Sequence, residues 1–489
     1  MSVLLTHGYF LKEDLKEQQI MRPYPPLGLL YVGTYLEEHG IENEVFDTTF
    51  SSKGEFQQHL IAERPTIIGI YVNLMTKLNV LETVRFIRSN LPETKIILGG
   101  PEVTYAAENF LRYGADCIVI GEGEETMLEV VKSLTPAYRP ARLCPSPSQL
   151  DFQGSMLNSS GEERDFEFGE EIKGIAFLKD GMFVQTPERE KIKDLDELPI
   201  PNRKKINLQH YLDAWKKHHG KNAISVSTMR GCPYTCKWCS RAVYGLSYRR
   251  RSPEKVVEEL AMIKRDYNPD SLWFVDDVFT ISHKWLTAFR DELIRKDILI
   301  PYECITRADR MNEEVVKMLK ETGCFRVWIG AESGSQKVID LMDRRVDVNQ
   351  VRDMIRLTKR HGIEAGTFIM LGYPGETEAD IEETIHHLKE SNPDYFTITV
   401  AYPIKGTELY QEVEAHQTTR LDWATSTDRE IDFKRTYSRR FYDYAVKRVI
   451  NEVKYYSGRR NTALSLSLLK LKILSITARI GMQWHKNIS

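Results

Sequence analysis

Short apolar runs alternate with stretches of helical periodicity over most of this 489-residue chain. A run such as Thr66–Val72 is apolar almost throughout, as in strands that are buried on both faces of a sheet. A helix-length segment follows most runs, and this alternation is typical of parallel α/β sheets. The rhythm occurs twice, over residues 1–135 and 221–410, so the sequence predicts two α/β domains.

The alternation divides the chain into four expected segments. Residues 1–135 predict a doubly wound, Rossmann-like domain. Residues 136–220 predict a linker that is at first rich in Pro, Ser, Gly and acidic residues, with a small hairpin around the Asp-Gly pair at 180–181. Residues 221–410 contain about six strand–helix units, which favour an open or partial barrel. Residues 411–489 predict a helical, basic C-terminal region.

The composition excludes several broad classes of protein. Hydrophobic residues make up 42% of the chain, which excludes disorder as a description of the whole. No apolar run reaches the roughly 20 residues of a membrane-spanning helix, and the N-terminus lacks the basic region of a secretory signal. The net charge of -3 does not indicate nucleic-acid binding. We therefore expect a cytoplasmic protein whose 7 cysteines stay reduced.

The strongest chemical signal is a group of three cysteines directly after the first strand expected in 221–410. They are Cys232, Cys236 and Cys239, in the pattern C-x3-C-x2-C. Zinc sites usually need four ligands, and no fourth cysteine or histidine lies nearby. Three cysteines suit a 4Fe-4S cluster with one iron open to the amine and carboxylate of a small molecule. The alternative is a zinc-binding interaction protein whose fourth ligand is remote: Cys304, Cys324 or His283.

This motif resembles the cluster-binding loop of the radical S-adenosylmethionine (SAM) superfamily, and the resemblance covers about residues 221–410. It includes Trp238, just before the third cysteine, at an aromatic position that lies near the adenine in that family. It implies a partial (β/α)6 barrel with a 4Fe-4S cluster on the three cysteines and SAM on the open iron. In that family the cluster cleaves SAM to a 5'-deoxyadenosyl radical, which abstracts hydrogen from an unactivated carbon.

Further landmarks of the family follow the expected strand ends in order. Phe274–Asp277 occupies the place of the family's Gly-Gly-Glu turn, which holds the methionine amino group, although both glycines are replaced. Gly330–Ser335 resembles the ribose and carboxylate region, Gly366–Thr377 the adenine region, and Ala401–Thr407 the end of the sixth strand. The implied SAM contacts are Trp238, Asp276, Asp277, Arg307, Glu332, Ser333, Phe368, Leu371 and Tyr402.

Three of these landmarks also have a purely structural interpretation. Glu332 can cap a helix that starts near Ser335. The segment Gly372–Gly375 can be only a turn. Arg307 can be a surface charge. Their order and their place at strand ends favour the ligand-binding interpretation.

The N-terminal domain resembles the cobalamin (B12)-binding domain that precedes many radical SAM domains. The resemblance depends on Pro25–Tyr31, Gly99–Pro101 and Gly121–Glu124. Glycine turns at the rim of a parallel sheet let a large flat macrocycle approach the backbone. The implied cobalamin contacts are Thr6, Pro26, Leu27, Gly28, Asp47, Asn73, Gly99, Gly100, Pro101, Gly121 and Glu122.

The pattern Asp-x-His-x-x-Gly, which marks a histidine that ligates cobalt in related proteins, is absent. His7 follows the first expected strand, but no Asp stands two residues before it and Gly8 follows at once. If cobalamin binds, no obvious histidine reaches the cobalt. The alternative is a Rossmann-like cover for the barrel that has kept the fold without the cofactor.

The two resemblances together imply a radical SAM enzyme, with cobalamin-dependent C-methylation of a small molecule as the favoured reaction. The runner-up is cyclisation, as in the anaerobic magnesium-protoporphyrin monomethyl ester cyclase. A third reaction is radical carbon–carbon coupling on a lipid or tetrapyrrole. A non-catalytic cobalamin- or SAM-binding protein is the alternative of another class, and the intact cysteine motif argues against it. The implied electron donor is a flavodoxin or ferredoxin, and the sequence identifies no catalytic acid or base.

The segment from Tyr444 onward is basic. Glu452 is its single acidic residue, and residues 464–482 are apolar with interspersed Lys and Arg. This pattern is typical of an amphipathic helix that lies on an anionic membrane surface, which would favour a lipid, isoprenoid or tetrapyrrole substrate. The alternative is a helix packed across the barrel with its basic residues in water.

Overall fold

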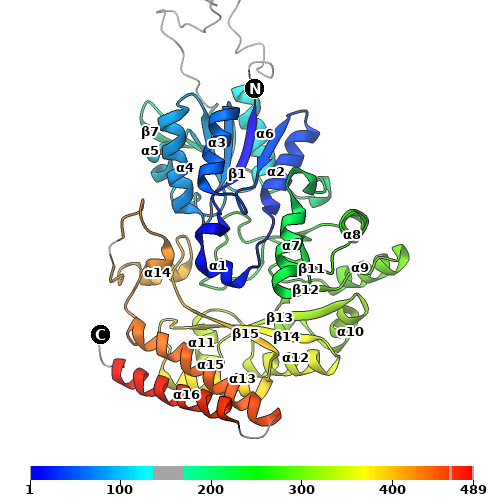
Figure 1. Ribbon diagram of the computed structural model, residues 1–489, viewed down its shortest axis with the longest axis vertical. Coiled ribbons are helices and arrows are strands. Elements are labelled where there is room, and N and C mark those ends of the chain that lie inside the picture. Colours follow the sequence, from blue (N-terminus) through cyan, green and yellow to red (C-terminus); the bar gives the residue numbers. More distant parts are fainter. Residues whose placement is uncertain (1, 136–168, 420, 462–464, 487–489) are drawn as a thin grey trace, which may run out of the picture. The chain divides into compact units, whose positions relative to one another are not determined.

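The computed structural model describes residues 2–135, 169–419, 421–461 and 465–486 (Figure 1). Most of the expected Pro-, Ser- and Gly-rich part of the linker lies outside these described residues. The chain divides into two compact units. Unit 1 contains the described residues of 1–193, 197–211 and 242–244, and unit 2 contains the remainder.

Unit 1 is built on a seven-stranded sheet in the order β2-β1-β3-β4-β5-β6-β7. Its strands are β1 (Val3–His7), β2 (Asn43–Phe46), β3 (Ile67–Tyr71), β4 (Lys95–Gly99), β5 (Cys117–Val119), β6 (Ile175–Lys179) and β7 (Met182–Gln185). The first five are parallel, as the sequence predicts. The hairpin β6–β7 is not a separate linker element, because β6 pairs antiparallel with β5 and covers an edge that would otherwise be open.

Helices follow the parallel strands of unit 1. They are α1 (Leu15–Ile20), α2 (Leu27–Glu38), α3 (Lys53–Glu63), α4 (Lys77–Asn90), α5 (Ala107–Tyr113) and α6 (Gly123–Leu134). The central strands are buried on both faces: Ile68, Ile96 and Ile118 are fully inaccessible to solvent. The chain then continues through α7 (Leu208–His219).

Unit 2 is built on six parallel strands in the order β15-β14-β13-β12-β11-β8, which confirms the expected partial barrel. Its strands are β8 (Ala223–Val226), β11 (Ser271–Phe274), β12 (Tyr302–Thr306), β13 (Cys324–Glu332), β14 (Glu364–Leu371) and β15 (Tyr395–Val400). Its intervening helices are α8 (Pro253–Asp266), α9 (His283–Lys296), α10 (Glu313–Glu321), α11 (Gln336–Leu341), α12 (Val348–Arg360) and α13 (Glu378–Ser391). Strands β8 and β15 form the two edges of this sheet, so it stays open among the described residues.

Two further features of unit 2 frame the site. A short antiparallel pair, β9 (Met229–Arg230) with β10 (Arg249–Arg250), was not expected from the sequence. The C-terminal region is helical, as expected, with α14 (Glu408–Glu414), α15 (Arg439–Asn461) and α16 (Leu466–His485). Helix α15 packs on α13, β14 and β15, and α16 packs on α15 (Figure 1). Among the described residues, no helix combines the length and the apolar character needed to cross a membrane.

Candidate functional site

The three cysteines lie on one loop between β9 and β10, just beyond the end of β8. Gly231 begins this loop with a left-handed φ of 81°, and a Cβ there would lie 2.6 Å from the carbonyl oxygen of Ser247. Only glycine fits such a close approach without strain. The backbone of Cys232 also forms an isolated β-bridge with that of Leu246, so the two ends of the loop are fixed to each other.

The far side of the loop is attached to other parts of unit 2. The Lys237 N–H donates to the Met342 carbonyl oxygen at 3.1 Å, and the Lys237 carbonyl oxygen accepts from Leu409 N–H at 3.0 Å. The Thr235 hydroxyl donates to Asp343 at 2.7 Å. The loop therefore has a defined conformation, set by the segment after α11 and by the start of α14.

Two buried arginines face the central cysteine. The Nη1 atoms of Arg307 and Arg344 lie 3.7 Å and 3.9 Å from the Cys236 sulfur. Arg307 Nη2 donates to the Arg344 carbonyl oxygen and Arg344 Nη2 donates to the Gly330 carbonyl oxygen, each at 2.7 Å. Both guanidinium groups are therefore within reach of the sulfur, where they can stabilise the negative charge of a cysteine that is bound to iron.

The two outer cysteines have a different electrostatic environment. Burial raises the pKa of the Cys232 thiol, and it raises the pKa of Cys239 to about 12. The negative charge of Asp277 shifts both pKa values in the same direction. These two thiols therefore hold their protons in the metal-free chain, and metal binding would release them.

Glu332 ends β13 in a strained backbone conformation. Its φ is 64°, and the pairing register between β13 and β14 shifts between Gly330 and Glu332. Burial raises the pKa of its carboxyl group, while Arg344, 3.6 Å away, and Arg307 oppose this rise. Non-glycine residues held in this region of φ cluster at functional sites. The helix-capping interpretation of Glu332 is not favoured, because Ser335 occupies the N-cap of α11.

The two aspartates after β11 have different surroundings. Asp276 is buried, and its carboxylate accepts from Thr228 N–H at 2.7 Å, from the Thr228 hydroxyl and from Met229 N–H. Arg250 lies 3.5 Å from the same carboxylate. The Asp277 side chain is exposed to solvent, but protein atoms crowd its carboxyl group, and this partial desolvation together with the neighbouring Asp276 charge raises its pKa. Asp276 is therefore committed to the turn after β8, whereas Asp277 is accessible.

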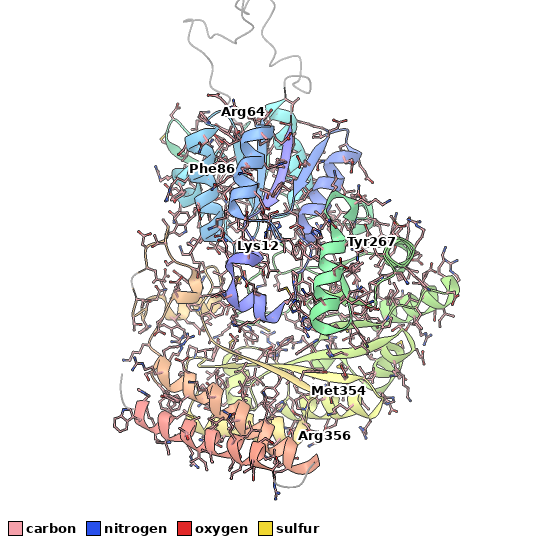
Figure 2. All side chains as sticks on the ribbon, viewed as in Figure 1. Lys12, Arg64, Phe86, Tyr267, Met354 and Arg356 are labelled. Atoms are coloured by element: carbon pink, nitrogen blue, oxygen red, sulfur yellow. The ribbon has the colours of Figure 1, made fainter. Side chains whose placement is uncertain are left out.

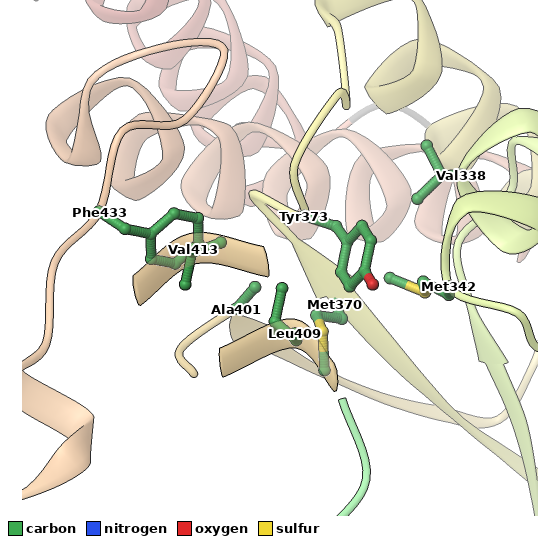
Figure 3. Packing of buried hydrophobic residues seen from close by; sticks show 8 residues of the cluster. All are labelled: Val338, Met342, Met370, Tyr373, Ala401, Leu409, Val413 and Phe433. Atoms are coloured by element: carbon green, nitrogen blue, oxygen red, sulfur yellow. The ribbon is translucent and has the colours of Figure 1, made fainter. Parts of the chain in front are cut away.

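An apolar cluster lies beside the cysteine loop, and Trp238 packs against it. It is formed by Val338, Met342, Met370, Tyr373, Ala401, Leu409, Val413 and Phe433 (Figure 3). Leu371 is buried at the end of β14, and Tyr402 follows β15 and is half-buried. The structure thus brings the expected adenine region and the sixth strand end next to the aromatic residue of the cysteine motif.

The remaining expected SAM contacts take part in internal interactions. Phe368 stacks on Trp328 with ring centroids 5.1 Å apart. The Ser333 hydroxyl lies 3.2 Å from the Thr384 hydroxyl and accepts from Ser335 N–H. Arg344 is the residue that sequence reasoning missed. It lies between Asp343 and Arg345, both with left-handed φ, in a turn that matches no motif.

The expected cobalamin contacts of unit 1 lie along one edge of its sheet, at the carboxyl ends of β1 to β5. Several of their side chains make internal hydrogen bonds. Thr6 donates to the Phe46 carbonyl oxygen, Asn73 accepts from Met75 and Thr76 N–H, and Glu122 accepts from Ile192 N–H. A ligand at this edge would therefore meet mainly backbone atoms rather than free polar side chains.

The glycines and prolines of this edge supply that backbone. Gly100 has a φ of 110° and a Cβ there would lie 2.5 Å from the Val72 carbonyl oxygen, so glycine is required. Gly28 is exposed in the first turn of α2, where a Cβ would meet no atom within 4 Å. The remaining members are Pro26, Leu27, Gly99, Pro101 and Gly121. Such a surface fits a flat macrocycle that approaches the backbone.

His7 is not available as a cobalt ligand. Its Nε2 lies 3.0 Å from Asp47 Oδ1, and its Nδ1 accepts from Tyr9 N–H at 3.1 Å. The second oxygen of Asp47 accepts from the Tyr211 hydroxyl at 2.7 Å. These hydrogen bonds, chiefly the one from His7, hold the pKa of Asp47 below its usual value. Both ring nitrogens of His7 are therefore engaged inside unit 1.

The three remote residues considered as a fourth zinc ligand take part in other contacts. In the described part of the chain no three side chains of His, Cys, Asp or Glu are grouped closely enough to hold a metal ion, and this holds for the three loop cysteines as well. Cys304 and Cys324 are buried on the neighbouring strands β12 and β13 and interact with each other. His283 begins α9, where its Nε2 lies 3.3 Å from the Arg310 carbonyl oxygen.

Comparison with known proteins finds one family model in each of the two α/β domains. The radical SAM superfamily model matches residues 226–388, and the B12-binding domain model matches residues 20–131. An uncharacterized methyltransferase of Pyrococcus horikoshii is 30% identical over 399 residues, which are 79% of this chain and 78% of that protein. The chain belongs to the radical SAM superfamily. Its cofactors are accordingly a 4Fe-4S cluster and SAM in the radical SAM domain and cobalamin in the B12-binding domain.

One further curated protein and one solved structure extend the comparison. The anaerobic magnesium-protoporphyrin IX monomethyl ester cyclase of Rubrivivax gelatinosus is 24% identical over 81% of this chain and 67% of its own length. The structure of TsrM, a radical SAM methyltransferase from Kitasatospora setae with cobalamin and a 4Fe-4S cluster bound, has a TM-score of 0.72 at 16% identity. The match covers 98% of this chain and 99% of TsrM, so the two proteins share a fold.

Proposed function

We propose that this radical SAM enzyme methylates an unactivated carbon of a small molecule in a cobalamin-dependent reaction. The observation that carries the proposal is the cysteine loop, in which two buried arginines approach the Cys236 sulfur, in a chain that also has a B12-binding domain. The relative with 30% identity is called a methyltransferase, and TsrM is one. When bound, the cluster supplies the electron that cleaves SAM and cobalamin supplies the methyl group.

Each cofactor has proposed ligands in this chain. Cys232, Cys236 and Cys239 hold the cluster, and Arg307 and Arg344 stabilise the negative charge on the central thiolate. For SAM we propose Asp277 rather than Asp276 as the contact of the methionine amino group, because only Asp277 has an accessible carboxylate. Trp238 and the apolar cluster beside it would exclude water from the adenine.

The proposed cobalamin surface is the glycine- and proline-rich edge of unit 1. Since His7 is engaged on both ring nitrogens, this proposal includes no histidine ligand from that residue to the cobalt. The substrate is a small molecule, and the electron donor would be a flavodoxin or ferredoxin. A lipid or tetrapyrrole substrate would agree with a peripheral membrane contact through the C-terminal segment, which the exposed face of α16 supports.

Cyclisation is the second candidate reaction, because the cyclase of Rubrivivax gelatinosus aligns with 81% of this chain. The two reactions differ in their SAM products. Cobalamin-dependent methylation consumes SAM both as a methyl donor and as the source of the radical. Cyclisation consumes it only as the source of the radical.

The test is anaerobic. The reconstituted protein would be incubated with dithionite, SAM and hydroxocobalamin, and 5'-deoxyadenosine and S-adenosylhomocysteine would be measured by mass spectrometry. Cys236→Ala should abolish both products, whereas the matched control Cys324→Ala, which removes a buried thiol outside the loop, should retain them. S-adenosylhomocysteine that depends on cobalamin supports methylation, and deoxyadenosine alone supports cyclisation or coupling. Neither product, from protein with a complete cluster, would contradict the proposal and favour a non-catalytic binding protein.

A further inference from the structure

Helix α16 has two faces with different surroundings. Leu468, Ser475, Ala478 and Met482 are buried against the rest of unit 2. The opposite face carries six apolar residues at spacings of three and four, and each is between 46% and 86% exposed. They are Leu466, Leu469, Ile473, Ile476, Ile480 and Trp484, which we call the outer stripe. A continuous exposed apolar surface of this kind marks an interaction site.

The outer stripe does not hold α16 in place. Helices α15 and α16 approach each other closely at two glycines: a Cβ at Gly481 would lie 2.5 Å from the Tyr444 ring, and one at Gly458 would collide with Leu468. Glu452 accepts from Lys472 at 3.0 Å and from Ser475 at 2.8 Å, which ties α15 to α16. These contacts all lie on the buried side, and the side chains on the other side of α16 extend away from α15 (Figure 2).

Basic residues border the outer stripe. Helical geometry places Lys470 on one side of the stripe and Arg479 on the other, and both are exposed. Lys447 and Lys454 on α15 are exposed as well. Glu452, the single acid from Tyr444 onward, is bound to Lys389 and Lys472, and these bonds overcome the effect of its burial and lower its pKa to about 2.

The exposed apolar stripe with basic residues on both sides favours one kind of binding partner. We propose that the outer stripe of α16 docks on an anionic lipid surface, with the apolar residues among the acyl chains and Lys470 and Arg479 at the headgroups. Trp484, 75% exposed near the end of the helix, is of the residue type that anchors at the membrane interface. Pairing with a second copy is disfavoured, because it would bring the same cations of both copies together. The inference is independent of the reaction proposed above.

The test is flotation of the full-length protein with vesicles of phosphatidylcholine, with and without phosphatidylglycerol. The wild-type protein should float with the anionic vesicles and lose most of this binding at high salt, because headgroup attraction is screened. Ile473→Glu/Ile480→Glu should lower the bound fraction by about ten-fold or more. The matched control is Ile294→Glu, which changes a 69% exposed isoleucine on α9 and should leave binding unchanged.

A second variant tests the charges separately. Lys470→Glu/Arg479→Glu keeps the whole outer stripe and should lose the preference for anionic vesicles. The inference is overturned by equal binding of the wild-type protein and Ile473→Glu/Ile480→Glu, or by an absence of vesicle binding in the wild-type protein. A dimer in solution that this double variant dissociates would also overturn it, in favour of a second copy as the occupant.

Discussion

At the scale of single residues, the site shows how far a motif can predict chemistry. The three cysteines and Arg307 follow strand ends and match a known pattern, so they could be found in the sequence. Arg344 could not be found, because it comes from a turn after α11 that has no motif, and only the fold brings it within 3.9 Å of Cys236. The choice between Asp276 and Asp277, both of which the sequence predicts as SAM contacts, is of the same kind, since it depends on the hydrogen bonds that Asp276 accepts from Thr228.

Glu376 in the turn after β14 carries a prediction about pH. It is fully buried, one of its oxygens accepts from Gly372 N–H, and burial raises its pKa to about 8. Asp380 raises this pKa further, and Lys337 opposes it. At pH values between the ordinary pKa of 4.5 and the raised pKa of about 8, Glu376 loses its proton in the unfolded chain and keeps it in the folded chain. The contribution of Glu376 to stability is therefore present below this window and is lost as the pH rises through it.

The direction of this pH dependence of stability sets the expected result. Glu376→Gln keeps the size of the side chain and removes the titration, so the stability of the wild-type protein should fall relative to the variant by about 2 kcal/mol between about pH 6 and pH 8. Urea denaturation of both proteins at the two pH values measures the difference. A constant difference would show that Glu376 is ionised in the folded protein.

At the scale of elements, the sequence predicts the barrel better than it predicts the site. The periodicity of the sequence predicts helices over 253–266 and 378–391, and α8 and α13 have these bounds. These helices have regular apolar spacing between clear strands. Helix α3 has only a weak helical periodicity in the sequence because it buries only Phe56 and Leu60, although the residues of its capping box, Ser52 and Glu55, can be recognised. The pairing of β6 with β5 is tertiary, so no local pattern could indicate it.

Gly334, in the turn between β13 and α11, gives a prediction about packing of elements. A Cβ there would lie 2.5 Å from the Thr384 Cα and from the Glu383 carbonyl oxygen on α13, and backbone cannot move aside cheaply. Gly334→Ala should therefore destabilise the protein by about 1–3 kcal/mol. The matched control is Gly54→Ala in α3, where the nearest atom lies 4.0 Å away. Urea denaturation should show a loss for Gly334→Ala only, and equal stability of the two variants would contradict the packing argument.

At the scale of the whole molecule, the two proposed cofactor sites belong to different compact units. The cysteine loop lies in unit 2, and the glycine- and proline-rich edge lies in unit 1. The sequence indicates this division through its two separate regions of alternating strand and helix patterns. Within unit 1, the hydrogen bonds of His7, Asp47 and Tyr211 connect the ends of β1 and β2 to the start of α7 and involve no residue of the cysteine loop.

Because each site is built within its own unit, we expect loss of one cofactor to leave binding of the other intact. The variant Cys232→Ala/Cys236→Ala/Cys239→Ala should lose iron and acid-labile sulfide while it retains cobalamin at the wild-type ratio after desalting. Absorption spectra measure the cobalamin, and chemical assays measure the iron and sulfide. The converse variant, Gly100→Val, places a side chain against the Val72 carbonyl oxygen and should lose cobalamin but keep the cluster. Loss of cobalamin from the folded cysteine variant would show that the two sites depend on each other.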